Sequence, residues 1–132
     1  MADNLLEKLY TAPEASYHVL DEAKAKRMNA LTLYIPSVQD VAKVIREIPY
    51  GETRTIIELR QTLAILGNAE TACPAKTIKY WKWLASAYDQ ALMNDESMVI
   101  PWWRVLKDDK PSRHMPGGIE NHLHMLRLEG HD

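Results

Sequence analysis

The chain has 132 residues, 46% of them hydrophobic and 26% charged, and this size and balance suit one globular domain with a substantial core. No apolar run reaches the roughly 18–20 residues of a membrane span, and residues 1–4 lack the pattern of a signal peptide, so we expect no membrane partner and a cytoplasmic location. The single cysteine excludes a disulfide within the chain.

The overall charge gives no support to a nucleic-acid binder. The net charge is −2 and the isoelectric point is about 6.2, without the basic excess that many such proteins carry. A local basic patch is nevertheless compatible with the sequence, because phosphates meet only one face of a protein. Basic residues gather between positions 48 and 88, namely Arg54, Arg60, Lys76, Lys79 and Lys82.

Residues 1–36 are predicted to form an N-terminal extension to the main domain. Apolar residues at helical spacing predict a short helix over residues 3–11, which Pro13 ends. Residues 15–30 have no clear type, and the alternation in residues 31–35 predicts a strand before Pro36. The simplest interpretation of the extension is a structural cap or an oligomer contact.

The next segment predicts three helices and a helix-turn-helix. Ser37 begins the first helix, which ends near residue 48 before a turn over residues 49–52. Thr55 is suited to cap the second helix, and Gly67 to end it. Pro74 suits the first turn of a third helix that extends toward residue 93. A short connection between the last two helices is typical of a helix-turn-helix whose second helix reads DNA.

The last part of the chain predicts a small β-wing and a closing helix. Residues 97–106 are apolar and rich in β-forming residues, and residues 107–111 resemble the tip of a wing turn. Two glycines precede an apolar helical pattern over residues 119–128. We therefore predict a mostly α fold with a small β-wing, a winged helix-turn-helix domain over residues 37–132.

Four short motifs stand in order along the chain. Residues 48–53 read Ile-Pro-Tyr-Gly-Glu-Thr, residues 101–105 Pro-Trp-Trp-Arg-Val, residues 117–119 Gly-Gly-Ile and residues 126–130 Leu-Arg-Leu-Glu-Gly. In this order and spacing they resemble the C-terminal DNA-binding domain of the alkylguanine-DNA alkyltransferases, whose active-site segment reads Pro-Cys-His-Arg-Val. The resemblance covers residues 38–130 and implies a winged helix-turn-helix.

The reactive residues of that family are missing. Trp102 stands at the position of the nucleophilic cysteine and Trp103 at that of the histidine that helps ionise it. A thiolate can accept an alkyl group, whereas an indole cannot. Tryptophan at the cysteine position marks the alkyltransferase-like proteins, which bind damaged DNA without repairing it. The resemblance therefore implies a protein that is not an enzyme.

The resemblance also implies a site for a flipped, alkylated guanine that would be handed to DNA repair. Pro101, Trp102, Trp103 and Arg104 would line this lesion pocket, with Trp102 as a flat apolar surface and Arg104 as a brace. Glu129 matches a glutamate of the enzyme's proton relay and would be structural here. The alternative is that both tryptophans fill the core of a small domain.

The DNA-contacting positions depart from the family pattern. Lys76 replaces the arginine that enters the base stack, and Ile56, after Thr55, replaces a tyrosine that helps rotate the nucleotide. Small residues that admit the minor groove are replaced by Lys79 and Tyr80, followed by Trp81, and we expect their bulk to hold the helix away from the groove floor.

These departures leave two functions open. One is lesion binding on double-stranded DNA, with a repair protein as a further partner. The other is a repurposed domain that binds a protein or small ligand without base flipping. The lysines and aromatics of residues 76–83 suit a phosphate-binding, base-stacking surface, and they equally suit an amphipathic helix with solvated lysines.

We expect no cofactor, metal or catalytic residue. His122 and His124 are two residues apart on a predicted helix and face different directions, and His114 adds no complete ligand set. Cys73 has no histidine at a matched position and is interpreted as inert, although an active transferase would have to use it.

Overall fold

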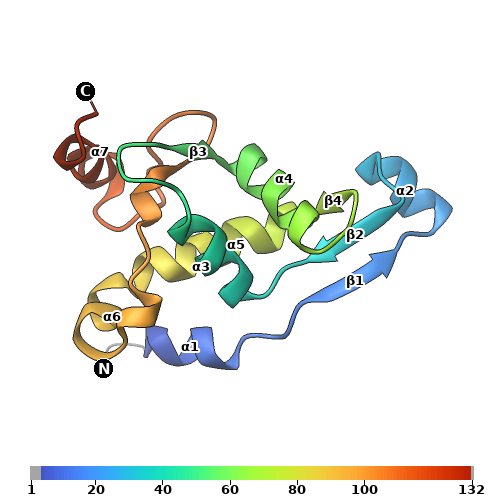
Figure 1. Ribbon diagram of the computed structural model, residues 1–132, viewed down its shortest axis with the longest axis horizontal. Helices are drawn as coiled ribbons and strands as arrows, with labels where there is room; N and C mark the ends of the chain where they lie inside the picture. Colours follow the sequence, from blue (N-terminus) through green and yellow to red (C-terminus); the bar gives the residue numbers. More distant parts are fainter. Residues whose placement is uncertain (1–3, 132) are drawn as a thin grey trace.

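Helices make up most of the molecule in the computed structural model, which describes residues 4–131 (Figure 1). The helices are α1 (Leu5–Thr11), α2 (Glu22–Met28), α3 (Val38–Arg46), α4 (Ile56–Leu66), α5 (Pro74–Ser86), α6 (Tyr88–Asn94) and α7 (Gly118–Leu128), with short 3-10 turns η1 (Glu96–Met98) and η2 (Trp102–Arg104). The strands are β1 (Ser16–Val19), β2 (Thr32–Ile35), β3 (Arg54–Thr55), β4 (Thr71–Ala72) and β5 (Val105–Leu106). Within residues 4–131, no helix has the length and apolar character needed to cross a membrane.

The predicted helix-turn-helix is confirmed as α4, a short turn that contains β4, and α5. Thr55 caps α4 through its hydroxyl, which accepts from the Glu58 backbone N–H at 3.1 Å, and the Glu58 carboxylate returns a bond to the Thr55 N–H at 3.0 Å. The last turn of α4 closes at Gly67, and Pro74 occupies the first turn of α5. These local signals mark the ends of α4 and the start of α5.

Helix α3 completes the core around α5. Ser37 and Asp40 form the predicted capping box at its start, and its apolar side faces inward. The buried residues of α3 join those of α4 and α5 in one cluster, in which Val41, Ile45, Leu63 and Leu84 are fully buried. Burial of this apolar surface is the main term that stabilises the domain.

The N-terminal extension packs onto the domain at two places. Helix α1 lies near α5 and α6 and buries Leu6 and Leu9 in the common core (Figure 1). Strand β2 lies between β1, to which it is antiparallel, and β4, to which it is parallel. The predicted helix and strand of the extension are confirmed, and the undefined residues 15–30 contain β1 and α2.

Two secondary-structure predictions are wrong. Residues 97–106 are not one strand, because Pro101 lacks an N–H for a ladder and η2 buries two indoles, so only β5 pairs, in parallel with β3. The helix predicted from Pro74 toward residue 93 breaks at Ala87, which is buried, and the new direction brings Tyr88 of α6 onto Trp103. The wing is reduced to a tight turn, which an isolated antiparallel β-bridge between the backbones of Lys107 and Lys110 closes.

Candidate functional site

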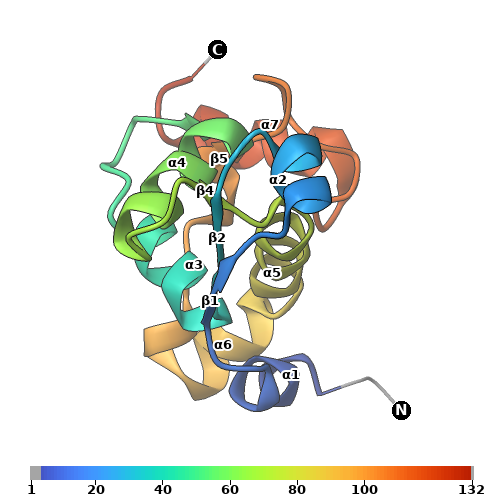
Figure 2. The same cartoon turned by 90° about the vertical axis from the view of Figure 1, so that its right-hand side faces the viewer.

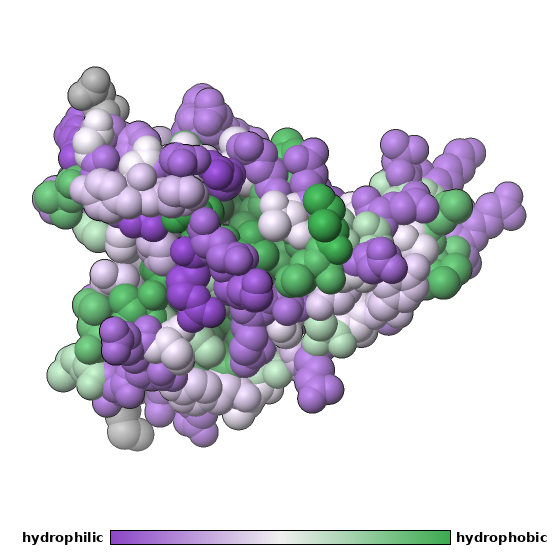
Figure 3. Space-filling view, viewed as in Figure 1, coloured by the Kyte–Doolittle hydropathy of each residue, from purple (hydrophilic) through white to green (hydrophobic). Residues whose placement is uncertain are grey.

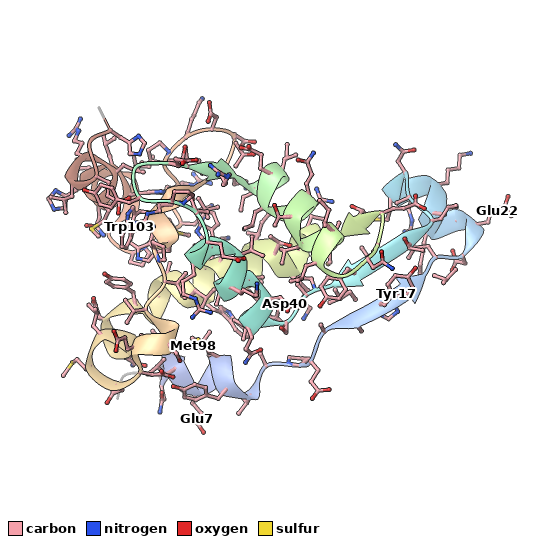
Figure 4. The ribbon with its side chains drawn as sticks, viewed as in Figure 1. Glu7, Tyr17, Glu22, Asp40, Met98 and Trp103 are labelled. Atoms are coloured by element: carbon pink, nitrogen blue, oxygen red, sulfur yellow. The ribbon has the colours of Figure 1, made fainter. Side chains whose placement is uncertain are left out.

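The tryptophan pair of η2 lies inside the molecule. Trp102 is 3% exposed and Trp103 is 8% exposed. The two indole rings pack edge to face, with their centroids 5.6 Å apart. The Trp102 ring also packs against the His122 ring and the Trp103 ring against the Tyr88 ring, with centroid distances of 5.4 and 5.6 Å. Figure 4 places Trp103 near α7, at the end of the molecule away from Tyr17 and Glu22. In this structure the two indoles are part of the hydrophobic core.

Side chains from α5 and α7 hold η2 by hydrogen bonds to its backbone carbonyls. The indole N–H of Trp81, on α5, donates to the Trp102 carbonyl at 2.9 Å. His122, on α7, accepts from the Ser112 N–H through Nδ1 at 3.0 Å, so its Nε2 carries the proton and donates to the Trp103 carbonyl at 2.9 Å. Burial lowers the pKa of His122, which favours this neutral form. His122 is therefore a structural link between α7 and η2.

Arg104 and Glu129 form a bidentate ion pair behind the tryptophans. Arg104 donates from Nε to Oε1 of Glu129 at 2.9 Å and from Nη2 to Oε2 at 2.7 Å, and its Nη1 donates to the Ile48 carbonyl at 2.9 Å. The side chains are only 14% and 8% exposed. The arginine beside it lowers the pKa of Glu129. The Trp103 indole N–H adds to this lowering, although its geometry falls short of a hydrogen bond. The pair ties η2 to the end of α7 and to the residues after α3.

Trp102 leaves one polar group unsatisfied. Its indole N–H is buried and finds no acceptor among residues 4–131. Buried donors without partners are rare in native structures, since each one loses its bonds to water. The Trp102 indole N–H is therefore a buried donor without a partner in the described part of the chain.

The predicted DNA-contacting residues separate into an outer and an inner set. Lys79 is exposed and Lys76 is partly exposed on α5, with their ammonium groups 4.8 Å from the Trp83 ring and 5.7 Å from the Tyr80 ring. Ile56 and Tyr80 are buried, 7% and 1% exposed, so their side chains do not meet a ligand at the surface. Thr55 is partly exposed, but its hydroxyl already caps α4.

The expectation that bulky residues hold α5 away from a groove is wrong for two of its three residues. Tyr80 and Trp81 point into the core, where Trp81 is fully buried. Only Lys79 remains on the outer face, and a lysine side chain is flexible enough to move aside. The outer face of α5 is therefore lysine-rich and is not blocked by rigid aromatic rings from positions 80 and 81.

Two of the basic residues that the sequence grouped together are engaged within the protein. Arg54 pairs with Glu52 at 3.0 Å. Arg60 donates to the Ala72 carbonyl at 3.1 Å and to the Thr71 hydroxyl at 3.3 Å, and so connects α4 with β4. Both arginines are thus bound within the protein, whereas none of the ion pairs in the described residues involves a lysine of α5.

The structure connects one of the basic residues found in the sequence, Lys82, with a loop that the sequence reasoning did not place beside it. Lys82 of α5 lies close enough to His114 to lower the pKa of that imidazole, and Arg113 and Lys107 lower it further. These residues come from α5 and from the loop after β5, which lie far apart in the sequence. In the sequence, the cations of residues 107–114 were the signal that could have indicated a basic loop. Only the fold brings this loop close to Lys82.

No group of three or more potential metal ligands (His, Cys, Asp or Glu) comes together within residues 4–131. Cys73 is a partly exposed free thiol that precedes α5 at the N-cap position. Cys73 therefore belongs to the start of α5, whereas η2 contains Trp102 and no cysteine.

The helix-turn-helix with a lysine-bearing second helix defines a DNA-binding class of domain. The family model described as the DNA binding domain of 6-O-methylguanine DNA methyltransferase matches residues 36–131. The chain belongs to this family, whose domain binds DNA, and its fold is of the winged-helix type, as the sequence motifs predict. Comparisons with curated proteins and with solved structures gave no match.

Proposed function

We propose that this protein binds double-stranded DNA through the outer face of α5, recognises alkylated guanine and does not transfer the alkyl group. The observation that carries the proposal is Trp102 in place of the reactive cysteine, in a chain that belongs to the methyltransferase family. Alkyl transfer needs a nucleophile that attacks the alkyl carbon and displaces guanine O6 as the leaving group. The indole of Trp102 offers no such nucleophile. Recognition would then serve hand-over of the lesion to other repair proteins.

The lysines of α5 are the features that favour DNA. Lys76 and Lys79 lie one helical turn apart, and Lys82 follows on the same outer side. No side chain of the described residues caps the start of α5, and since Pro74 has no N–H, the backbone N–H groups of Ala75 and Lys76 are the ones that a phosphate would meet. Lysines at this spacing release counterions when they meet phosphates, and this release dominates the affinity of nonspecific DNA binding.

Recognition of a damaged base would require η2 to open. A base leaves the stack at a cost of a few kcal/mol, and a closely fitting pocket offsets this cost. Trp102 would supply the flat surface, and its unpaired indole N–H would supply a donor to the base. The base can enter only after the packing of Trp102 against Trp103 and His122 loosens.

A second candidate function is the binding of a protein or small ligand without base flipping. The buried Ile56 and Tyr80 and the lysine at position 76 favour it, because none of them offers the planar, insertable group that fills a gap in a duplex. The two functions differ in one respect that can be measured, which is affinity for DNA.

Replacement of Lys76 or Lys79 by alanine should weaken binding to duplexes of every sequence. Each change should lower the slope of log affinity against log salt by about one, since each removes one phosphate contact. Fluorescence anisotropy with a labelled duplex at several KCl concentrations measures this slope. Lys76→Arg should instead keep the slope and strengthen binding to a lesion-bearing duplex, because a guanidinium stacks where an ammonium does not.

Lys43→Ala is the matched control for these variants. Lys43 is also an exposed helical lysine, but it lies on α3 and pairs with Glu47 at 3.4 Å. Its replacement should leave the salt slope unchanged. Equal slopes for Lys76→Ala, Lys79→Ala and Lys43→Ala would remove α5 from the DNA interface and favour the second candidate function.

A further inference from the structure

The N-terminal extension forms an arm that lies outside the part of the chain matched by the family model. The arm comprises β1, α2 and β2, residues 16–35, whereas the match begins at residue 36. Figure 1 shows the arm reaching from the helical body along the longest axis of the molecule. In Figure 4, Tyr17 and Glu22 mark the arm at the end opposite to Trp103. Contacts made by the arm would therefore fall well beyond the tryptophan pair.

The arm is fixed directly to the start of α5. Strand β2 pairs with β4, the last element before α5, and the Cys73 N–H donates to the Tyr34 carbonyl at 2.9 Å. The Tyr34 ring also fills the space beside Gly67, where a Cβ would lie 2.1 Å from a ring atom. The Tyr34 hydroxyl then donates to the Asp40 carboxylate at 2.6 Å. These contacts hold the arm and the helix-turn-helix as one unit.

Helix α2 has a basic surface and no core side. None of its residues, Glu22–Met28, is buried, although all of them belong to the described part of the chain. Asp21 caps the helix by accepting a hydrogen bond from the Lys24 N–H at 2.8 Å. Lys26 and Arg27 occupy the last turn, and both are exposed. Hydrophilic side chains project from this end of the molecule in Figure 3. Only Ala25 and Met28 are partly buried, so this seven-residue helix gains little stability from packing.

Helices α2 and α5 lie on the same side of the molecule. Figure 2 looks at the end that carries the arm and shows α2 and α5 on one side, with α3 and α4 on the other. Figure 1 separates α2 from α5 along the long axis. The two helices therefore belong to one surface of the molecule, at separate places along its long axis. A duplex laid along that surface would meet both helices.

We propose that α2 is a second DNA-contacting element, in which Lys26 and Arg27 bind backbone phosphates that flank the site held by α5. The occupant is duplex DNA because the exposed charges of this last turn are positive and α2 lies on the same side of the molecule as α5. Phosphate contacts of this kind orient a protein on the duplex and carry no sequence information of their own. The inference rests on the proposed DNA binding and extends its footprint.

The test compares two double variants that remove the same charges from matched places. The variant Lys26→Ala with Arg27→Ala removes both basic side chains from the last turn of α2. The variant Lys43→Ala with Arg46→Ala removes both basic side chains from the last turn of α3, which lies on the other side of the molecule. Anisotropy titrations with undamaged duplexes of about 10 and about 20 base pairs, at about 50 to 200 mM KCl, give affinities and salt slopes.

The α2 variant should bind the short duplex like the wild type and lose about two from the salt slope on the long one. The α3 variant should match the wild type on both duplexes. Identical slopes for the two variants on the long duplex, while Lys79→Ala still weakens binding, would overturn the role of α2 and leave the proposed function intact. A wild-type protein that binds neither duplex would overturn both.

Discussion

Trp102→Ala should lower the free energy of unfolding by about 3–5 kcal/mol, the cost of removing a large aromatic side chain from a core. Trp102 is 3% exposed and packs against Trp103 and His122, so its removal leaves a cavity that these rings cannot fill without moving. A loss of this size is a large part of the stability of a domain, which is commonly about 5–15 kcal/mol. Urea unfolding followed by far-UV circular dichroism measures it.

Trp83→Ala provides the control for the Trp102 variant. Trp83 is a partly exposed tryptophan on the surface of α5, where Lys79 and Lys8 lie over its ring at 4.8 and 5.8 Å. Its removal should cost clearly less than the removal of Trp102, because less of its area is buried. A Trp102→Ala protein as stable as Trp83→Ala would show that the indole at position 102 is not a core residue and that its site opens easily.

Glu129→Gln should destabilise the protein by about 3 kcal/mol, because it leaves the Arg104 guanidinium largely buried beside a neutral amide. The effect should depend on pH. Arg104 lowers the pKa of Glu129 below its ordinary value of 4.5, so the unfolded chain binds this proton more readily than the folded chain. The stabilisation is therefore complete above pH about 4.5 and is lost as the pH falls through the lower folded value.

Urea midpoints measured from neutral pH down through the titration range of the carboxylates give the contribution of this pair. The difference between wild type and Glu129→Gln should narrow in acid, as the wild-type carboxylate takes up its proton. Arg104→Lys serves as the conservative variant, since it keeps a charge and loses the bidentate geometry, and it should fall between the two. A difference that stays constant across this pH range would assign the loss to packing and not to the ion pair.

The sequence was most informative where a local signal decides the structure. Ser37, Thr55 and Pro74 each mark a helix start that depends only on nearby residues, and all three starts are confirmed. Residues 97–106 show the opposite case. Their composition favours a strand, but Pro101 and the burial of two indoles produce a 3-10 turn, which depends on partners from α6 and α7.

The candidate site was predictable in its residues and not in their orientation. The motifs indicated Trp102, Trp103, Arg104 and Glu129, and the structure brings these four residues together. For α5, the interleaved lysines and aromatics fit two helix phases. Packing against α3 and α4 settles the phase, and it turns Tyr80 inward while Lys79 stays outside. The loop residues that approach Lys82 required the tertiary fold.

The most direct measurement is a titration of two labelled duplexes that differ by a single 6-O-methylguanine. The proposed function predicts that the protein binds the damaged duplex more tightly by about tenfold, since stacking of one base on an aromatic side chain is worth about 1–3 kcal/mol. It also predicts an unchanged protein mass in the same sample. Equal affinity for the two duplexes would contradict lesion recognition, and the gain of one methyl group by the protein would contradict binding without transfer.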